Sequence, residues 1–185
     1  MCIEVLRDSA KSINDAKKKR SLNKTLIVLT ETAVIFGISA ALMLANAGVY
    51  GTQLLLPVFT IFALVIVFGL LSGIVVHVAT TTLGGKGRYF EGLTSVSYSL
   101  VPAAVGLLLS SILIFVPYSI GVQIIVFSVA FAMALGILYR AIKELYSTDI
   151  LISFISVSVV MLSLIMAVYA AVGLSLVNGA TASVV

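Results

Sequence analysis

The amino-acid sequence predicts an all-α, polytopic membrane protein: a bundle of five transmembrane helices preceded by a short amphipathic surface helix. Three observations predict this class. First, 61% of the 185 residues are hydrophobic and 10% are charged, whereas a soluble domain is about a quarter charged. Second, the apolar residues gather in long runs, each reaching the roughly 20 residues that a helix needs to cross the hydrocarbon. Third, no alternating pattern of transmembrane strands interrupts the runs.

The first domain, residues 1–25, is the long polar segment of the chain. Residues 1–24 hold seven basic and three acidic side chains, a net charge of +4. Four apolar residues recur there at helical spacing: Ile3, Leu6, Ala10 and Ile13. This stripe predicts a helix on the membrane surface, with its basic side chains near anionic headgroups. The alternative is a solvated tail whose charge sets topology. No cleavable signal is expected, because the first apolar run starts after residue 25 and is too long.

The transmembrane domain is expected over residues 26–178, followed by a short tail over residues 179–185. Its five apolar runs are Leu26–Gly48, Gln53–Ala79, Leu93–Phe115, Ser119–Tyr139 and Ile150–Val177. With five crossings, all 11 Lys and Arg fall on one side, in the N-terminal segment and in loops 80–92 and 140–149. The positive-inside rule then places the N-terminus in the cytoplasm and the C-terminus outside. This asymmetry explains the basic pI of about 9.3 without a nucleic-acid partner.

Small residues at helical spacing predict how the spans pack, because close approach matters more than apolar burial between helices in lipid. The clearest pattern is Gly69-x-x-x-Gly73 in the second run. Two interpretations are open for these glycines: they pack helices within one compact bundle, or they form the contact of a homo-oligomer.

The third run carries Pro102 near its middle, which predicts a kink. The kink either fits the bundle or opens a cavity beside Tyr98, Ser95 and Ser99. In the first run, Glu31 is predicted to be the one acid inside an apolar segment. A carboxylate at that depth is costly, so Glu31 is expected in an ion pair or as a hydrogen-bonded acid near the interface.

The loop Gly84-Gly85-Lys86-Gly87 lacks the spacing and the strand-loop-helix context of a phosphate-binding loop, so nucleotide binding is rejected. Lys86, Arg88 and Arg140 are instead candidate contacts for lipid headgroups. His77 has no second His or Cys nearby, so a metal site is not expected, and Cys2 is a weak candidate for acylation. No catalytic set or paired intramembrane acids are found. We therefore expect neither enzyme activity nor a cofactor.

Several stretches together resemble the Yip family of Ypt/Rab-interacting membrane proteins. They are Leu83-Gly84-Gly85-Lys86-Gly87, Tyr98-Ser99-Leu100-Val101-Pro102, the segment Leu138–Leu145, and the opening Val5-Leu6-Arg7-Asp8-Ser9, which is similar to the short pre-helix of prokaryotic members. The resemblance implies five spans and a location in the cell membrane of a prokaryote. Eukaryotic members carry a longer N-terminal region and an Asp-Leu-Tyr-Gly-Pro motif, both absent here. A Rab-binding role is therefore not implied.

Two functions from different classes are expected. The first is a non-enzymatic scaffold or membrane-organising protein, with membrane lipids as partners and a homo-oligomer or other membrane proteins as further ones. The second is a small transporter or lipid-handling protein with a cavity near the kinked third span. An accessory subunit of a larger membrane complex is a third interpretation.

Overall fold

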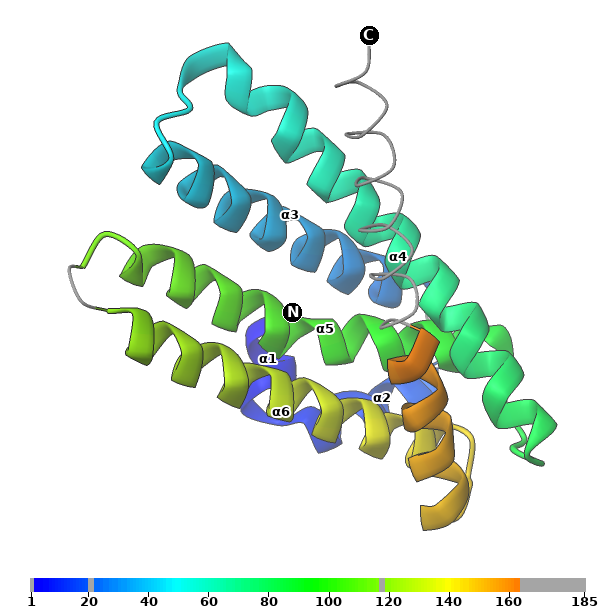
Figure 1. Cartoon of the computed structure of the whole chain (residues 1–185). Helices are drawn as coiled ribbons and strands as arrows, with labels where there is room; N and C mark the ends of the chain where they lie inside the picture. Colours follow the sequence, from blue (N-terminus) through cyan, green and yellow to red (C-terminus); the bar gives the residue numbers. More distant parts are fainter. Residues whose placement is uncertain (1, 20–21, 117–118, 164–185) are drawn as a thin grey trace, which may run out of the picture.

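The computed structural model describes residues 2–19, 22–116 and 119–163, and within these ranges the chain is helical without any strand. The elements are α1 (Cys2–Arg7), α2 (Ser9–Lys19), α3 (Leu22–Asn46), the 3-10 turn η1 (Gly51–Leu54), α4 (Leu55–Thr82), α5 (Tyr89–Leu113) and α6 (Ile120–Leu145) (Figure 1). A shorter apolar helix, Ile150–Ser163, follows. The all-α prediction is confirmed for this part of the chain.

Four helices in the described ranges are long and apolar enough to cross a membrane. They are α3, η1 with α4, α5 and α6, and they match the first four predicted runs. The helix Ile150–Ser163 starts where the fifth predicted run starts. The rest of that run, residues 164–177, lies outside the described residues, so the five-span count stays a prediction.

The helices extend beyond the apolar runs because polar side chains support their ends. α5 begins at Tyr89 rather than Leu93, since the Glu91 carboxylate accepts a hydrogen bond from the Arg88 backbone N–H at 2.7 Å. This is the reciprocal half of a capping box at a helix start. α6 continues past Tyr139 to Leu145. Arg140 and Glu144 form an ion pair there at 2.7 Å with the i, i+4 spacing that supports helices.

The centre of the fold is α5, which contacts α3, α4 and α6. Figure 1 shows α3 with α4, and α5 with α6, as two antiparallel helix pairs. Residues 91–99 of α5 are buried without interruption. Most of them are small or hydroxylated, and hydroxyls such as Ser97 Oγ donate to the carbonyl one turn earlier. This local bonding satisfies polar groups inside the bundle, so the three neighbouring helices can approach α5 closely.

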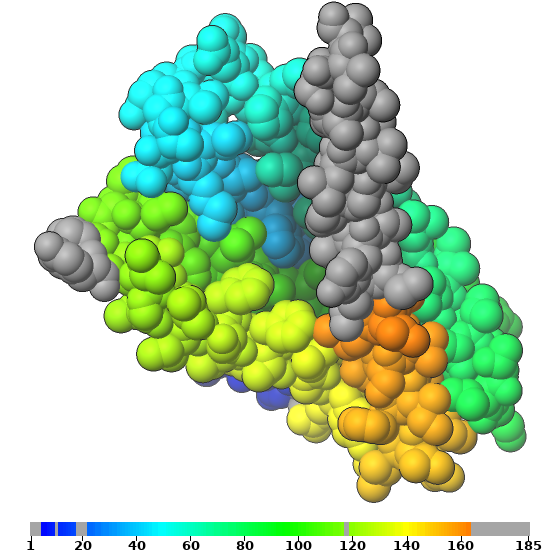
Figure 2. Space-filling model, viewed as in Figure 1, coloured from blue at the N-terminus to red at the C-terminus, as the bar shows by residue number. Residues whose placement is uncertain are grey.

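The outer surface is strongly apolar. Large side chains on α4, α6 and the last helix are more than half exposed, among them Leu56, Phe59, Leu64, Ile120, Ile124, Ile125, Leu151 and Phe154. Figure 2 shows α6 and the helix Ile150–Ser163 on the same face of the molecule. An exposed apolar surface of this kind would drive a soluble protein to aggregate, whereas a bilayer matches it.

The N-terminal segment forms two short helices that pack on the bundle, and the prediction of a single membrane-surface helix is not confirmed. α1 contacts α3 and α5, and α2 contacts α5 and α6. Val5 and Ile13 are 2% and 0% exposed, and Ala16 joins them in the hydrophobic core. Apolar side chains of this segment are thus buried against the protein itself. Of the predicted stripe, Ile13 is buried and Leu6 packs against the core, but the break at Asp8 divides the predicted helix in two. The position of this segment on the membrane surface stays a prediction.

Candidate functional site at the charged end of the bundle

The glycine-rich loop between α4 and α5 is folded around one aromatic ring, that of Tyr146, which directly follows α6. Tyr146 is fully buried. The Lys86 N–H donates to the Tyr146 carbonyl at 3.2 Å. Gly87 lies flat against the ring, so closely that a Cβ atom there would overlap ring carbons. Gly84 has a φ of +92°, which favours glycine and lets the loop turn. The glycines therefore let the loop turn and let its backbone approach the Tyr146 ring closely.

The Tyr146 hydroxyl is the polar centre of this cluster. It donates to the Arg88 carbonyl at 3.3 Å and lies 3.4 Å from Nδ1 of His77 on α4. Burial raises the pKa of the Tyr146 phenol, and the negative charge of Glu91 raises it further. The phenol therefore stays protonated at physiological pH and remains a hydrogen-bond donor. His77, where no metal site is expected, lies beside this hydroxyl.

α4 and α5 approach each other closely next to this ring. A Cβ atom on Gly92 of α5 would lie 2.5 Å from the Gly73 carbonyl oxygen of α4 and 2.8 Å from the Tyr146 hydroxyl. Glu91, the neighbour of Gly92, is 5% exposed. The α4–α5 crossing, the loop and the end of α6 are thus held as one unit.

The N-terminal helices join the same end through Lys17. Its ammonium donates to the Glu144 carbonyl at 2.5 Å and to the Ser147 hydroxyl at 3.1 Å. The carbonyls in the last turn of a helix lack partners within it, and a cation there also interacts favourably with the helix dipole. Lys17 therefore caps α6 from a distant part of the sequence. We call the region formed by α2, loop 83–88 and the end of α6 the charged end.

The three candidate headgroup contacts lie at this end, but their settings differ. Lys86 and Arg88 are exposed on the loop that Tyr146 holds. Arg140 is exposed on α6, with its guanidinium already paired to Glu144. Lys86 and Arg88 are thus accessible to solvent or headgroups. The charge of Arg140 is offset by Glu144.

The four residues predicted to line a cavity all lie on α5. Tyr98, Ser95 and Pro102 are buried, and Tyr98 belongs to the hydrophobic core. Ser99 lies on another face, beside an apolar hollow of about 150 Å³. Other lining residues come from four helices and include Phe68, Leu100, Leu135 and Val160. Of the four candidates, Ser99 is the one that lines this hollow among the described residues.

The other candidates take individual places in the bundle. Glu31 is partly buried in α3 and is not an isolated charge. Gly69 is buried where a Cβ atom would lie 2.6 Å from Leu29 of α3. A Cβ atom on Gly73 would lie 3.0 Å from the Cα of Leu93 on α5. Both glycines therefore contact helices of this same chain.

Two important residues were missed by the sequence reasoning. Tyr146 lies in a short polar stretch, and its contacts come from residues 58 and 69 positions away. No local sequence pattern predicts these contacts. Glu91 was assigned to a loop, which left Glu31 as the single acid in an apolar run. The structure corrects this, because α5 includes Glu91. A signal existed, since Glu91 stands three residues after Arg88 at the start of a helix, the spacing of a capping box.

Comparison with known families gives one match, to the Yip1 domain, over residues 3–172. No curated protein and no solved structure is significantly similar to the chain. The match covers α1 to α6 and the helix that follows them, and it confirms the resemblance carried by the loop and by the Tyr-plus-Pro third span. The chain therefore belongs to the Yip1 domain family and is an integral membrane protein.

Proposed function

We propose that this protein is a non-enzymatic membrane scaffold whose charged end binds anionic lipid headgroups on the cytoplasmic side. One observation carries the proposal: the exposed cations Lys86 and Arg88 sit on a loop fixed by the buried Tyr146. A preorganised loop loses little conformational freedom when it binds. Yip family proteins are generally not enzymes, which agrees with this role.

The alternative, a transporter or lipid-handling protein, has weaker support. Tyr98, beside which its cavity is expected, is buried in the hydrophobic core. The hollow beside Ser99 measures about 150 Å³, whereas ligand sites usually measure about 300–1,000 Å³. Self-association also remains part of the scaffold proposal. Its contact is expected away from Gly69 and Gly73, because α3 and α5 already cover them.

Neutralising the loop cations is expected to weaken the retention of anionic lipid. Each Lys or Arg near a membrane surface contributes about 1 kcal/mol, which corresponds to roughly a fivefold change in affinity. Native mass spectrometry of protein released from phosphatidylglycerol-containing nanodiscs measures the lipid retained by wild type, Lys86→Gln and Arg88→Gln. Arg140→Gln is the matched control and should change retention less, because Glu144 already pairs with Arg140. Equal losses in all three variants would contradict the proposal.

The proposed orientation predicts which loops react from outside the cell. Lys86→Cys and Thr52→Cys, each in a Cys2→Ser background, place single thiols at opposite ends of the bundle. Both positions are exposed. A membrane-impermeant maleimide should label Thr52→Cys in intact cells and Lys86→Cys after permeabilisation. The reverse pattern would show that the charged end faces outward.

A further inference from the structure

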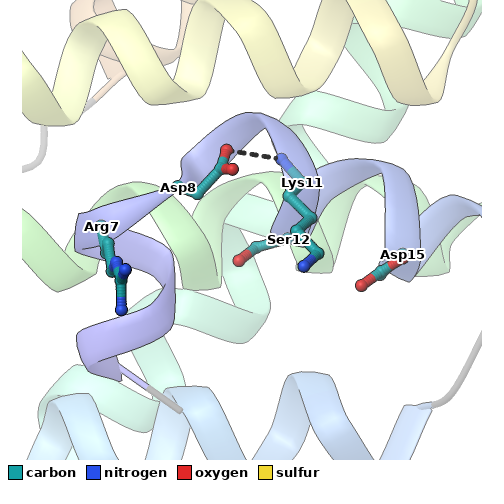
Figure 3. A pocket seen from close by; sticks show the side chains of 5 residues that line it. All are labelled: Arg7, Asp8, Lys11, Ser12 and Asp15. Atoms are coloured by element: carbon teal, nitrogen blue, oxygen red, sulfur yellow. Dashed lines mark hydrogen bonds between the residues drawn. The ribbon is translucent and has the colours of Figure 1, made fainter.

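A polar hollow of about 490 Å³ lies against the N-terminal helices, apart from the loop around Tyr146. Its size falls within the range of small-molecule sites, about 300–1,000 Å³. Among the residues that the structure describes, its lining contains two basic, two acidic and one hydroxyl side chain: Arg7, Asp8, Lys11, Ser12 and Asp15. In Figure 3, the side chains of Arg7, Lys11, Ser12 and Asp15 point to the same side of the α1–α2 segment.

The break between α1 and α2 positions these groups. Asp8 separates the two helices, and its carboxylate accepts a hydrogen bond from the Lys11 N–H at 3.0 Å (Figure 3). This is the usual way in which an aspartate caps a helix start. The buried Val5 and Ile13 fix the two helices to the bundle. The hollow is therefore built on a capped turn with apolar anchors on both sides.

The charged groups around the hollow do not neutralise each other. Among the described residues, no ion pair joins Arg7, Lys11 or Asp15 to another side chain. Two cations and two anions within one hollow disfavour a purely anionic ligand, because Asp8 and Asp15 repel it. They disfavour a purely cationic ligand in the same way. A ligand that carries both charges can satisfy both sets.

We propose that this hollow binds a zwitterionic phosphodiester with a primary amine, the chemistry of a phosphoethanolamine headgroup. Arg7 and Lys11 hold the phosphate, to which the guanidinium can donate two parallel hydrogen bonds. Ser12 adds a hydroxyl donor. Asp15 accepts hydrogen bonds from the ammonium, a contact that a quaternary ammonium cannot make. A lipid headgroup and a soluble glycerophosphodiester share this chemistry, and a lipid is the source that we favour for a protein embedded in a bilayer. The site goes beyond the proposed scaffold role and uses different residues.

Lipid competition tests the proposal with the full-length protein. Nanodiscs contain phosphatidylethanolamine, phosphatidylcholine and phosphatidylglycerol in equal amounts, and native mass spectrometry counts the lipids that the released protein retains. In the Lys86→Gln/Arg88→Gln background, which removes the proposed contacts for anionic lipid, phosphatidylethanolamine should be retained above the other two. Arg7→Ala and Lys11→Ala should each lower its retention about fivefold, the effect of one charge near a membrane surface. Asp15→Asn should abolish the preference over phosphatidylcholine while phosphate binding persists.

The controls separate this site from general charge effects. Lys24→Ala removes an exposed cation outside the hollow and should leave the preference unchanged. Arg7→Lys keeps the charge but loses the two parallel hydrogen bonds, so it should restore only part of the binding lost in Arg7→Ala. Calorimetry with soluble glycerophosphoethanolamine is the second arm. Equal affinity for this compound and for the lipid would support binding of the phosphoethanolamine group and would show that the ligand of the hollow is soluble. In the Lys86→Gln/Arg88→Gln background, preferential retention of phosphatidylglycerol, or an unchanged preference for phosphatidylethanolamine after Asp15→Asn, would overturn the proposal. Neither result would bear on Lys86 and Arg88.

Discussion

Tyr146→Ala is expected to destabilise the protein by about 3–5 kcal/mol, the usual cost of removing a large buried aromatic ring. Tyr146 has no exposed surface, and its ring lies against Gly87 while its backbone carbonyl accepts from Lys86. Tyr146→Phe keeps the ring and loses two long hydrogen bonds, so a loss of about 1 kcal/mol is expected. Unfolding of the detergent-solubilised protein by sodium dodecyl sulfate, followed by circular dichroism, measures both changes.

A matched control and a double-mutant cycle show whether the ring itself holds the loop. Tyr139→Ala removes a partly buried tyrosine from α6 and should cost less. Gly87→Ala should be destabilising in the wild type, because the new methyl group meets the Tyr146 ring. In the Tyr146→Ala background the same change should be tolerated, which is the non-additivity expected for residues in contact. Additive effects, or equal losses at positions 139 and 146, would show that the ring does not hold the loop.

The apolar runs predicted where helices form, because a segment that crosses lipid must satisfy its own backbone and be apolar over its length. They did not predict where the helices end. α5 starts at Tyr89 because Glu91 caps it, and α6 runs on to Leu145 through polar residues. These ends depend on side-chain hydrogen bonds and ion pairs that hydropathy does not measure.

The sequence did not predict which distant segments contact each other. The helical period of the N-terminal segment indicated a buried stripe, yet a period cannot tell whether lipid or protein covers it. Ile13 proves to be buried by the bundle. Tyr146 stands in an ordinary polar stretch, and its role arises because α4 and α6 end, and α5 begins, at the same end of the bundle. Small residues also differ in their surroundings: a Cβ atom would meet Leu29 of α3 at Gly69 and open space at Gly136.

Gly106→Ala is expected to destabilise the α5–α6 pair by about 1–3 kcal/mol, the usual cost of overpacking a core. Gly106 is buried where α5 crosses α6, and a Cβ atom there would overlap the Cβ of Ala130. Gly136→Ala on α6 is the matched change, with nothing within 4 Å of the new atom. It should leave stability unchanged or raise it by up to about 1 kcal/mol, because alanine favours helix more than glycine. The same detergent unfolding assay compares the two variants.

An exchange of the two side chains makes this prediction specific to the helix crossing. In the double variant Gly106→Ala/Ala130→Gly, one methyl group again lies between α5 and α6, now carried by the opposite helix. The double variant should therefore be more stable than Gly106→Ala, although the new glycine costs α6 about 1 kcal/mol of helix propensity. Without recovery, the loss in Gly106→Ala would have to arise from some contact other than Ala130. Equal effects of the alanines at positions 106 and 136 would place Gly106 outside the crossing.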